Sequence, residues 1–372
     1  MKNCLRYKSL LSFYSLSRGI KGFFVLLALL LFSCMKWDYK DEPTDYDVST
    51  PGLFILCEGN FQYSNATLSF YDPKTNAVEN EIFLKANGMK LGDVAQSMTI
   101  FRNTGWIAVN NSHVVFAIDI DTFKEKGRIE NLTSPRYIHF VSDKKAYISQ
   151  IWDNRIAIVD PETYSITGFI TIPDMDLSTG STEQMVQIGK YVYCNCWSYQ
   201  NRILKIDTEI DEVVEQLTVG IQPNSLVADR YGRLWTITDG GYDGSPYGYE
   251  APAIYCIDTE TLSLNKKFSF SLGDTPSELQ INGDGEFLYW INDDIWKMSI
   301  DSDHLPELPL IQSQSTKYYG LTIDPLNNEI YVADAIDYSQ QGMIYRFSPE
   351  GLEIDSFYVG VTPGAFCWKL KE

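Results

Sequence analysis

The chain has 372 residues, a formal net charge of −19 at pH 7 and 44% hydrophobic residues. This acidic balance excludes nucleic acid as a partner, because phosphates attract clusters of Lys and Arg, whereas the apolar fraction suffices for a folded core. Aromatic residues make up 14% of the chain, and the abundant Tyr and Phe favour strands.

Residues 1–33 predict a secretory signal. They carry five basic side chains and no acidic one, and an unbroken apolar run extends from Phe23 to Phe32. This run is too short to span a bilayer as a helix. It leads into Leu31-Phe32-Ser33-Cys34, which resembles a bacterial lipobox, so we expect cleavage before Cys34 and lipidation of Cys34. The alternative is an N-terminal helix buried against the rest of the chain.

Residues 34–50 are predicted to form a polar tether behind the lipidated cysteine. The stretch from Met35 to Glu42 becomes acidic soon after Cys34, which resembles the signal that sends lipoproteins to the cell surface in some Gram-negative bacteria. We therefore expect the protein at the outer membrane, exposed at the cell surface and held to the membrane by its lipid only.

A repeated unit dominates residues 51–372. Each unit has an apolar strand, an anchor residue, a turn that usually contains Thr, and a second strand; the anchors are Asp72, Asp119, Asp160, Asp207, Asp258, Asp301 and Ser348. Their spacings lie between 41 and 51 residues, a period typical of propeller blades. We predict an all-β, seven-bladed propeller with four-stranded blades, and the alternatives are a β-sandwich or a ring of six or eight blades.

The last strand is predicted to close the ring. The first unit lacks its innermost strand, because Leu53–Cys57 already corresponds to the second strand of the other units. The segment Pro363–Trp368 aligns with the innermost strands elsewhere, so we expect it to complete blade one and remove the exposed sheet edges. We expect Phe366 and Trp368 on opposite faces of this strand.

Motifs for catalysis and metal binding are absent from the sequence. The three His residues are scattered, and no nucleophile elbow, zinc-protease motif or phosphate-binding loop occurs. Asp174, Asp176 and Asn282 lie in segments that predict turns rather than calcium sites. The five cysteines after Cys34 are expected to be small buried hydrophobic residues. We therefore predict no enzymatic activity, no metal and no cofactor.

The loops between the second and third strands concentrate aromatic and acidic residues on one face of the predicted disc. Exposed aromatic rings in long loops are costly unless they contact one another or a ligand. The candidate ligand-binding residues in these loops are Trp152, Asp153, Asn154, Trp197, Tyr199, Asn201, Tyr242, Asp243, Tyr247, Tyr249, Asp337 and Tyr338. The candidates that begin the innermost strands, and would line the central funnel, are Gln96, Arg136, Gln184, Asn224, Glu278 and Tyr319.

The blade sequence from Ile156 to Thr163 resembles the YncE-like propellers. The segment from Gly52 to Asn60 is similar to surface lipoproteins of gut anaerobes in that group, of the cobalamin-binding BtuG type. The resemblance implies capture of cobalamin or another corrinoid and its transfer to a TonB-dependent outer-membrane transporter. A corrinoid would use aromatic contact area and acceptors for its amide N–H groups. A glycan ligand, a protein-binding scaffold, and a hydrolase or lyase are the alternatives.

Overall fold

The computed structural model describes residues 43–313 and 316–371. The predicted signal peptide, Cys34 and the first part of the predicted tether lie outside these ranges. Within the described ranges, no helix has both the length and the apolar character needed to cross a membrane.

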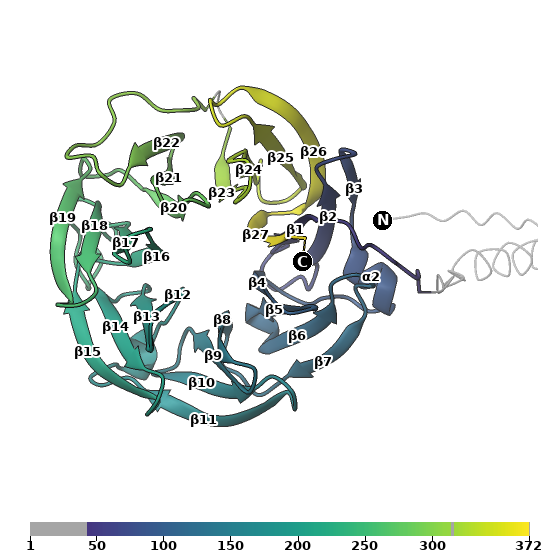
Figure 1. The fold of residues 1–372 in the computed structure, drawn as a ribbon, viewed down its shortest axis with the longest axis horizontal. Helices are drawn as coiled ribbons and strands as arrows, with labels where there is room; N and C mark the ends of the chain where they lie inside the picture. The colour runs from purple at the N-terminus through teal and green to yellow at the C-terminus, as the bar shows by residue number, and fades with distance from the viewer. Residues whose placement is uncertain (1–42, 314–315, 372) are drawn as a thin grey trace, which may run out of the picture. The chain divides into compact units, whose positions relative to one another are not determined.

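Seven antiparallel sheets are arranged in a ring, which confirms the predicted seven-bladed propeller (Figure 1). The strands of the first three blades, from the innermost outward, are β27 (Pro363–Lys369), β1 (Gly52–Cys57), β2 (Thr67–Asp72) and β3 (Ala77–Glu79); β4 (Ala95–Phe101), β5 (Thr104–Val109), β6 (Val114–Asp119) and β7 (Glu125–Ile129); and β8 (Pro135–Ser142), β9 (Lys145–Gln150), β10 (Arg155–Asp160) and β11 (Ser165–Thr171).

The other four blades follow the same order. Their strands are β12 (Met185–Ile188), β13 (Tyr191–Cys196), β14 (Arg202–Asp207) and β15 (Glu212–Thr218); β16 (Pro223–Ala228), β17 (Leu234–Thr238), β18 (Ala253–Asp258) and β19 (Ser263–Ser269); β20 (Ser277–Ile281), β21 (Phe287–Asn292) and β22 (Asp294–Ser299); and β23 (Tyr318–Ile323), β24 (Ile330–Asp334), β25 (Gln341–Phe347) and β26 (Glu353–Val361). The short helices are α2 (Ile82–Asn87), η1 (Asn110–Ser112) and η2 (Leu177–Thr179).

Blade six differs from the predicted four strands. Its outermost position holds an isolated bridge between Ile295 and Ile311 instead of a continuous strand. Pro306 and Pro309 lie in the segment that leads to this bridge, and proline has no N–H to donate to a ladder. The outer edge of this blade is therefore held by a few hydrogen bonds.

The C-terminal strand closes the ring as predicted. β27 pairs antiparallel with β1, so the two ends of the propeller share blade one (Figure 1). The expectation that Phe366 and Trp368 lie on opposite faces was wrong. Both pack into the layer between blades seven and one, because side chains two positions apart in a strand share a face.

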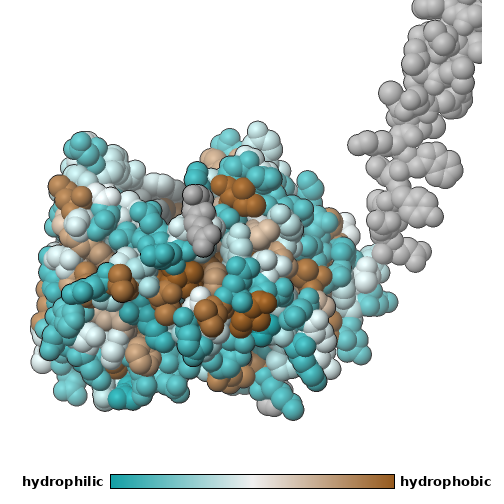
Figure 2. Space-filling model, turned by 90° about the horizontal axis from the view of Figure 1, so that it is seen from above, coloured by the Kyte–Doolittle hydropathy of each residue, from teal (hydrophilic) through white to brown (hydrophobic). Residues whose placement is uncertain are grey.

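The hydrophobic core is divided into seven layers, one between each pair of neighbouring blades. In β1, alternate side chains fill two of these layers. Phe54 and Leu56 pack in the layer toward blade two, whereas Leu53 and Ile55 pack in the layer toward blade seven. A strand buried on both faces reads as a continuous apolar run, whereas the outermost strands such as β15 are largely exposed and charged. Figure 2 shows hydrophobic side chains in small groups among hydrophilic ones on the side of the disc that it presents.

Six of the seven anchor residues cap the turns that the repeat predicted, and at Asp301 the cap comes instead from Ser299. Asp119 Oδ1 accepts hydrogen bonds from the backbone N–H groups of Asp121 and Thr122, and Ser348 Oγ accepts one from Glu350 N in the blade where Ser replaces Asp. The five cysteines among the described residues are free thiols, and all but the half-buried Cys367 are buried, as expected.

Residues 43–50, which were expected to belong to the tether, pack on blades one and two. The backbone N–H of Val48 donates to the carbonyl of Asp121 at 3.0 Å, and the Tyr46 ring lies 5.0 Å from the Phe123 ring. Lys369 joins this segment to the closing strand, because its ammonium contacts both the Val48 carbonyl and the Asp121 carboxylate. This part of the predicted tether is therefore packed on the propeller.

Candidate functional site

A cavity of about 800 Å³ lies in the middle of the ring and is lined by residues from all seven blades. It is formed at the face that carries the loops between second and third strands, because those loops and the beginnings of the innermost strands meet there. The strands and loops supply both polar and aromatic side chains. A polar cavity of this size is within the range of small-molecule binding sites.

Bulges in the innermost strands coincide with the side chains at the cavity wall. The ladder between β4 and β5 skips Gln96, and the corresponding ladders skip Arg136, Asn224, Glu278 and Tyr319. A bulged residue is released from the regular alternation of the strand, and its side chain is turned to a new direction. Each of these residues lines the cavity.

Arg136 is the cation among the residues lining the cavity, and it is neutralised inside the site. Its Nε lies 2.9 Å from both carboxylate oxygens of Glu183, and its guanidinium also donates to the amide oxygen of Gln96. Glu183 is buried, which raises the pKa of its carboxyl group, while the charge of Arg136 opposes that rise. A buried charge requires such pairing, so this ion pair is a rigid part of the wall.

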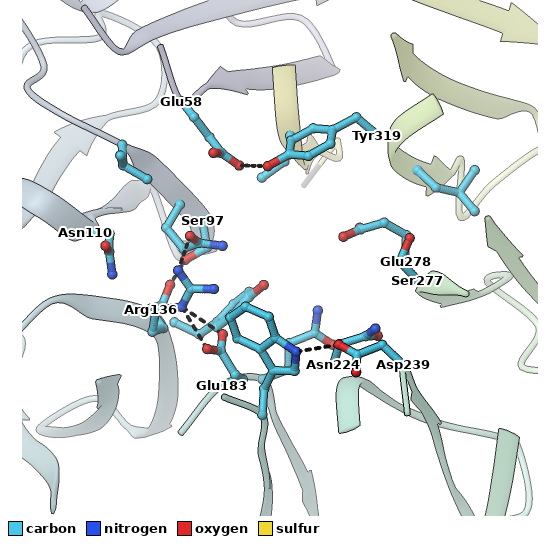
Figure 3. Close-up of a pocket in the computed structure, with 18 of the residues that line it drawn as sticks. Glu58, Ser97, Asn110, Arg136, Glu183, Asn224, Asp239, Ser277, Glu278 and Tyr319 are labelled. Carbon is cyan, nitrogen blue, oxygen red and sulfur yellow. Dashed lines mark hydrogen bonds and ion pairs between the residues drawn. The ribbon is translucent and has the colours of Figure 1, made fainter. Parts of the chain in front are cut away.

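Glu58 and Tyr319 form a second contact across the wall (Figure 3). The Tyr319 hydroxyl donates to Glu58 Oε1 at 3.0 Å. Burial raises the pKa of Glu58 and, together with the Glu58 charge, also raises the pKa of Tyr319. Gly364 leaves room for the pair, because a Cβ there would lie 2.6 Å from Glu58 Oε1 and 3.0 Å from the Tyr319 ring.

Glu278 projects into the cavity without a partner (Figure 3). Among the described residues, none forms a hydrogen bond or ion pair with its carboxyl group, which Figure 3 draws without a dashed line. Burial and the nearby Glu58 charge raise the pKa of Glu278 to about 8. Its backbone has a left-handed φ of 55°, a conformation that costs energy in a residue other than glycine.

Trp197 places an indole ring at the wall. Its Nε1 donates to Asp239 Oδ2 at 2.9 Å, and the same carboxylate accepts from the Gln222 amide. Burial raises the pKa of Asp239, and these hydrogen bonds oppose the rise. The Arg136 guanidinium lies 5.9 Å from the Trp197 ring centroid, so the ring orientation is fixed from both sides.

The structure brings eight of the sequence-predicted residues together around the cavity. These are Gln96, Arg136, Gln184, Asn224, Glu278, Tyr319, Trp197 and Tyr242. The other ten candidates do not line it; they are Trp152, Asp153, Asn154, Tyr199, Asn201, Asp243, Tyr247, Tyr249, Asp337 and Tyr338. Their roles in ligand binding stay predictions.

Three of those outer candidates form an aromatic row over blades three to five. The ring centroids of Trp152 and Tyr199 are 6.4 Å apart, and those of Tyr199 and Tyr247 are 4.6 Å apart. Trp152 and Tyr199 both have positive φ values, of 65° and 60°. Asp153 is different, because it is buried and both of its carboxylate oxygens accept from Arg155 at 2.9 Å.

Sequence reasoning did not select five ionisable wall residues: Glu58, Tyr137, Glu183, Asp239 and Tyr318. Glu58 and Asp239 each follow the second strand of a blade directly, in loops that the sequence analysis found to be rich in aromatic and acidic residues. Glu183, Tyr137 and Tyr318 each adjoin a selected rim residue in the sequence. A rule that included the sequence neighbours of each selected rim residue would have found these three. Within the described residues, no three His, Cys, Asp or Glu side chains come together in a metal-binding arrangement.

A family model described as a domain of unknown function, DUF5074, matches residues 51–359. The chain belongs to the DUF5074 family. The match covers every blade and ends before β27, the strand that closes the ring of this DUF5074 propeller. No curated protein sequence matches the chain.

Solved structures similar to this DUF5074 protein are also propellers. The periplasmic gluconolactonase of Pseudomonas aeruginosa has a TM-score of 0.63 and 12% identity, over 87% of this chain and all of the other. A putative 6-phosphogluconolactonase from Bacteroides fragilis has a TM-score of 0.62 and 14% identity, over 88% and 100%. A quinonprotein alcohol dehydrogenase-like protein from Bacteroides thetaiotaomicron has a TM-score of 0.62 and 12% identity, over 86% and 78%. At these identities the similarity establishes the fold alone.

Proposed function

We propose that this protein captures a small, uncharged, amide-rich ligand in the central cavity, and that the ligand is a corrinoid. The observation that carries the proposal is the composition of the wall, to which all seven blades contribute and in which amide side chains, carboxyl groups, phenol rings and an indole ring converge. Gln96, Gln184 and Asn224 belong to this set. Ligand sites typically combine apolar contact area with a few convergent polar groups.

The charges of the wall favour an uncharged ligand. Arg136 is paired with Glu183, and Glu58 is hydrogen-bonded to Tyr319, so these groups are already neutralised or solvated by protein. An anionic ligand would meet the negative side of this wall, and the cation that could receive it is engaged. A corrinoid brings many neutral amides and a wide apolar ring, which complement amide side chains and the Trp197 ring.

The cellular part of the proposal rests on the N-terminal sequence. A lipid on Cys34, followed by an acidic stretch, would hold the protein at the outside of the outer membrane. From there it would pass its ligand to a TonB-dependent outer-membrane transporter. The resemblance to surface lipoproteins of the BtuG type supports this step.

Titration calorimetry of the purified protein with cyanocobalamin, cobinamide and a glycan panel tests the ligand. We expect heat and a spectral change with the corrinoids. Trp197→Ala should weaken binding by about thirtyfold or more, as for aromatic anchors in desolvated pockets. The matched control is Lys144→Ala in an exposed turn of the opposite face. If a glycan produces heat and neither corrinoid does, the proposed ligand is a glycan and not a corrinoid.

A second candidate function is hydrolysis of a sugar lactone, and one observation favours it. Glu278 has a pKa of about 8 and lies in the same cavity as Glu58, whose charge contributes to that value. Carboxyl groups with a raised pKa serve as general acids. Two of the similar solved propellers carry lactonase names. A hydrolysis assay with gluconolactone, in which Glu278→Gln abolishes turnover, would favour this function over capture.

A further inference from the structure

We infer that Glu278 is the specificity-determining residue of the cavity and that it receives a primary carboxamide of the ligand through two complementary hydrogen bonds. The inference deepens the proposed function and rests on it in one respect, namely that the ligand carries amide groups. It assigns a chemical group of the ligand to a single side chain of the wall.

The backbone geometry of blade six holds the Glu278 side chain toward the cavity. The ladder between β20 and β21 pairs Ser277 with Ile291 and then Gln280 with Tyr289, so Glu278 and Leu279 have no partner in the register. Leu279 is buried in the layer toward blade five, and Glu278 faces the cavity. Its left-handed φ of 55° keeps this direction at a conformational cost. Strained residues of this kind persist where the surrounding structure over-determines them, and they gather at ligand sites.

The hydrogen-bonding state of Glu278 separates it from the other candidates at the rim. Gln96 and Arg136 bond to each other, the Gln184 amide oxygen accepts from Leu226 N, the Asn224 amide donates to the Pro276 carbonyl, and Tyr319 donates to Glu58. Those five side chains are already used by the fold. The Glu278 carboxyl group makes no such contact among the described residues, so its donor and acceptor are free for a ligand.

The surroundings of Glu278 favour its neutral form. The titratable groups on the neighbouring elements are Glu58 after β1, Tyr137 on β8, Tyr318 and Tyr319 on β23, and Asp239 after β17, while Arg136 is paired with Glu183. Burial, and secondarily the Glu58 charge, raise the pKa of Glu278 to about 8, so its carboxyl is largely protonated at neutral pH.

A protonated carboxyl group matches a primary carboxamide in both hydrogen bonds. It offers one O–H donor and one carbonyl acceptor on the same planar group. A primary carboxamide offers a carbonyl acceptor and an N–H donor with the same spacing, so the two groups close an eight-membered hydrogen-bonded ring. An ammonium would instead require the ionised form of Glu278, and a carboxylate would meet the nearby Glu58 charge.

The test measures cyanocobalamin affinity at pH 6.5, 7.5 and 9.5 for the wild type, Glu278→Gln, Glu278→Ala and the control Lys144→Ala. Wild-type affinity should fall about tenfold or more between pH 7.5 and 9.5, because ionisation removes the O–H donor. Glu278→Gln should keep affinity within about threefold at pH 7.5 and lose the pH dependence, since an amide presents the same donor and acceptor. At pH 6.5 and 7.5, Glu278→Ala should bind about tenfold more weakly than the wild type, and its affinity should not change with pH. Binding by Glu278→Ala equal to that of the wild type at pH 7.5 would overturn the inference and leave corrinoid capture standing.

A second probe separates the inference from the proposed ligand. Benzamide and benzylamine are titrated at millimolar concentration into the wild type and Glu278→Ala, and binding is followed by NMR. Binding of benzamide to the wild type but not to Glu278→Ala would uphold the carboxamide contact even if cobalamin does not bind. Tighter binding of benzylamine as the pH rises would overturn it in favour of a cationic ligand, and binding of neither compound would also overturn it.

Discussion

The hydroxyl of Tyr319 donates a hydrogen bond to Glu58 Oε1 at 3.0 Å, and thereby joins two residues separated by 261 positions in the chain. Tyr319 begins the innermost strand of blade seven, and Glu58 follows the second strand of blade one. The contact therefore crosses the junction at which the ring closes. It also belongs to the cavity wall, so closure of the ring and formation of the candidate site depend on the same pair.

Removal of this hydroxyl should lower stability. Tyr319→Phe leaves the half-buried Glu58 carboxyl without its donor. An unsatisfied buried polar group typically costs about 1–3 kcal/mol, so we expect a loss at the lower end of that range. Urea denaturation should show that decrease in the free energy of unfolding. The matched control is Tyr338→Phe, because the Tyr338 ring lies 5.6 Å from Tyr319 and is partly exposed. Equal stability of the two variants would mean that water replaces the hydroxyl without loss.

The closing strand should be essential to folding. Truncation after Gly360 removes β27. This strand pairs with β1 in blade one, and the ring centroid of its Trp368 lies 5.2 Å from that of Tyr331 in blade seven. We expect a melting temperature lower by ten degrees or more or no cooperative transition, because the loss exceeds that of one buried aromatic residue, about 3–5 kcal/mol. A truncation after Lys369, which keeps the strand, serves as the control. Closure through β27 would be refuted if both truncations melted alike.

The pH dependence of stability should differ between the wild type and Glu278→Gln. The folded-state pKa of Glu278 is raised to about 8, so the folded protein holds a proton that the unfolded chain releases near pH 4.5. Wild-type stability should therefore fall, relative to Glu278→Gln, by up to about 1.4 kcal/mol per pH unit as pH rises from about 5 to 8, and the difference should stay constant above that.

Denaturant titrations at each pH measure this difference, and Lys144→Ala should follow the wild type throughout. A constant difference between Glu278→Gln and the wild type from pH 5 to 9 would show that Glu278 ionises normally. The same result would remove the premise of the carboxamide contact.

Lipidation of Cys34 can be tested in cells. The sequence Leu31-Phe32-Ser33-Cys34 predicts a lipid on this thiol, so metabolic labelling with palmitate should mark the wild type and not Cys34→Ala. Protease treatment of intact cells should degrade the labelled protein, because we expect it on the outer surface. Cys57→Ala is the control, since that thiol is buried in blade one. Palmitate label on Cys34→Ala would contradict the prediction.

The outer aromatic row gives a further test of the binding face. Trp152→Ala removes one end of the row formed with Tyr199 and Tyr247. A drop in cyanocobalamin affinity of about tenfold or more would place this row in the ligand contact, together with Trp197 in the cavity. Phe169→Ala, which removes an exposed ring from the outermost strand of blade three, should leave affinity unchanged. If Trp152→Ala also leaves affinity unchanged, the ligand contacts the cavity wall without the row.

The repeat alone was enough to predict the ring and the rim positions at the beginnings of the innermost strands. The turn chemistry after Asp119 and its counterparts is local, and it recurs often enough to define seven blades. The alignment of Pro363–Trp368 with other innermost strands identified the closing strand, because each blade has the same order of strands. Arg136, Glu278 and the other rim positions could be selected for the same reason.

Which of those rim side chains already have protein partners depends on contacts that form only in the folded ring. Arg136 meets Glu183 and Tyr319 meets Glu58, whereas Glu278 is left with no protein partner among the described residues. Asp153 resembles the other loop acids in the sequence but pairs with Arg155 inside its own blade. These pairings depend on bulges and on ring closure, which bring distant residues within hydrogen-bonding distance. Sequence separation carries no information about such distances, so the free carboxyl group of Glu278 becomes visible only in the folded ring.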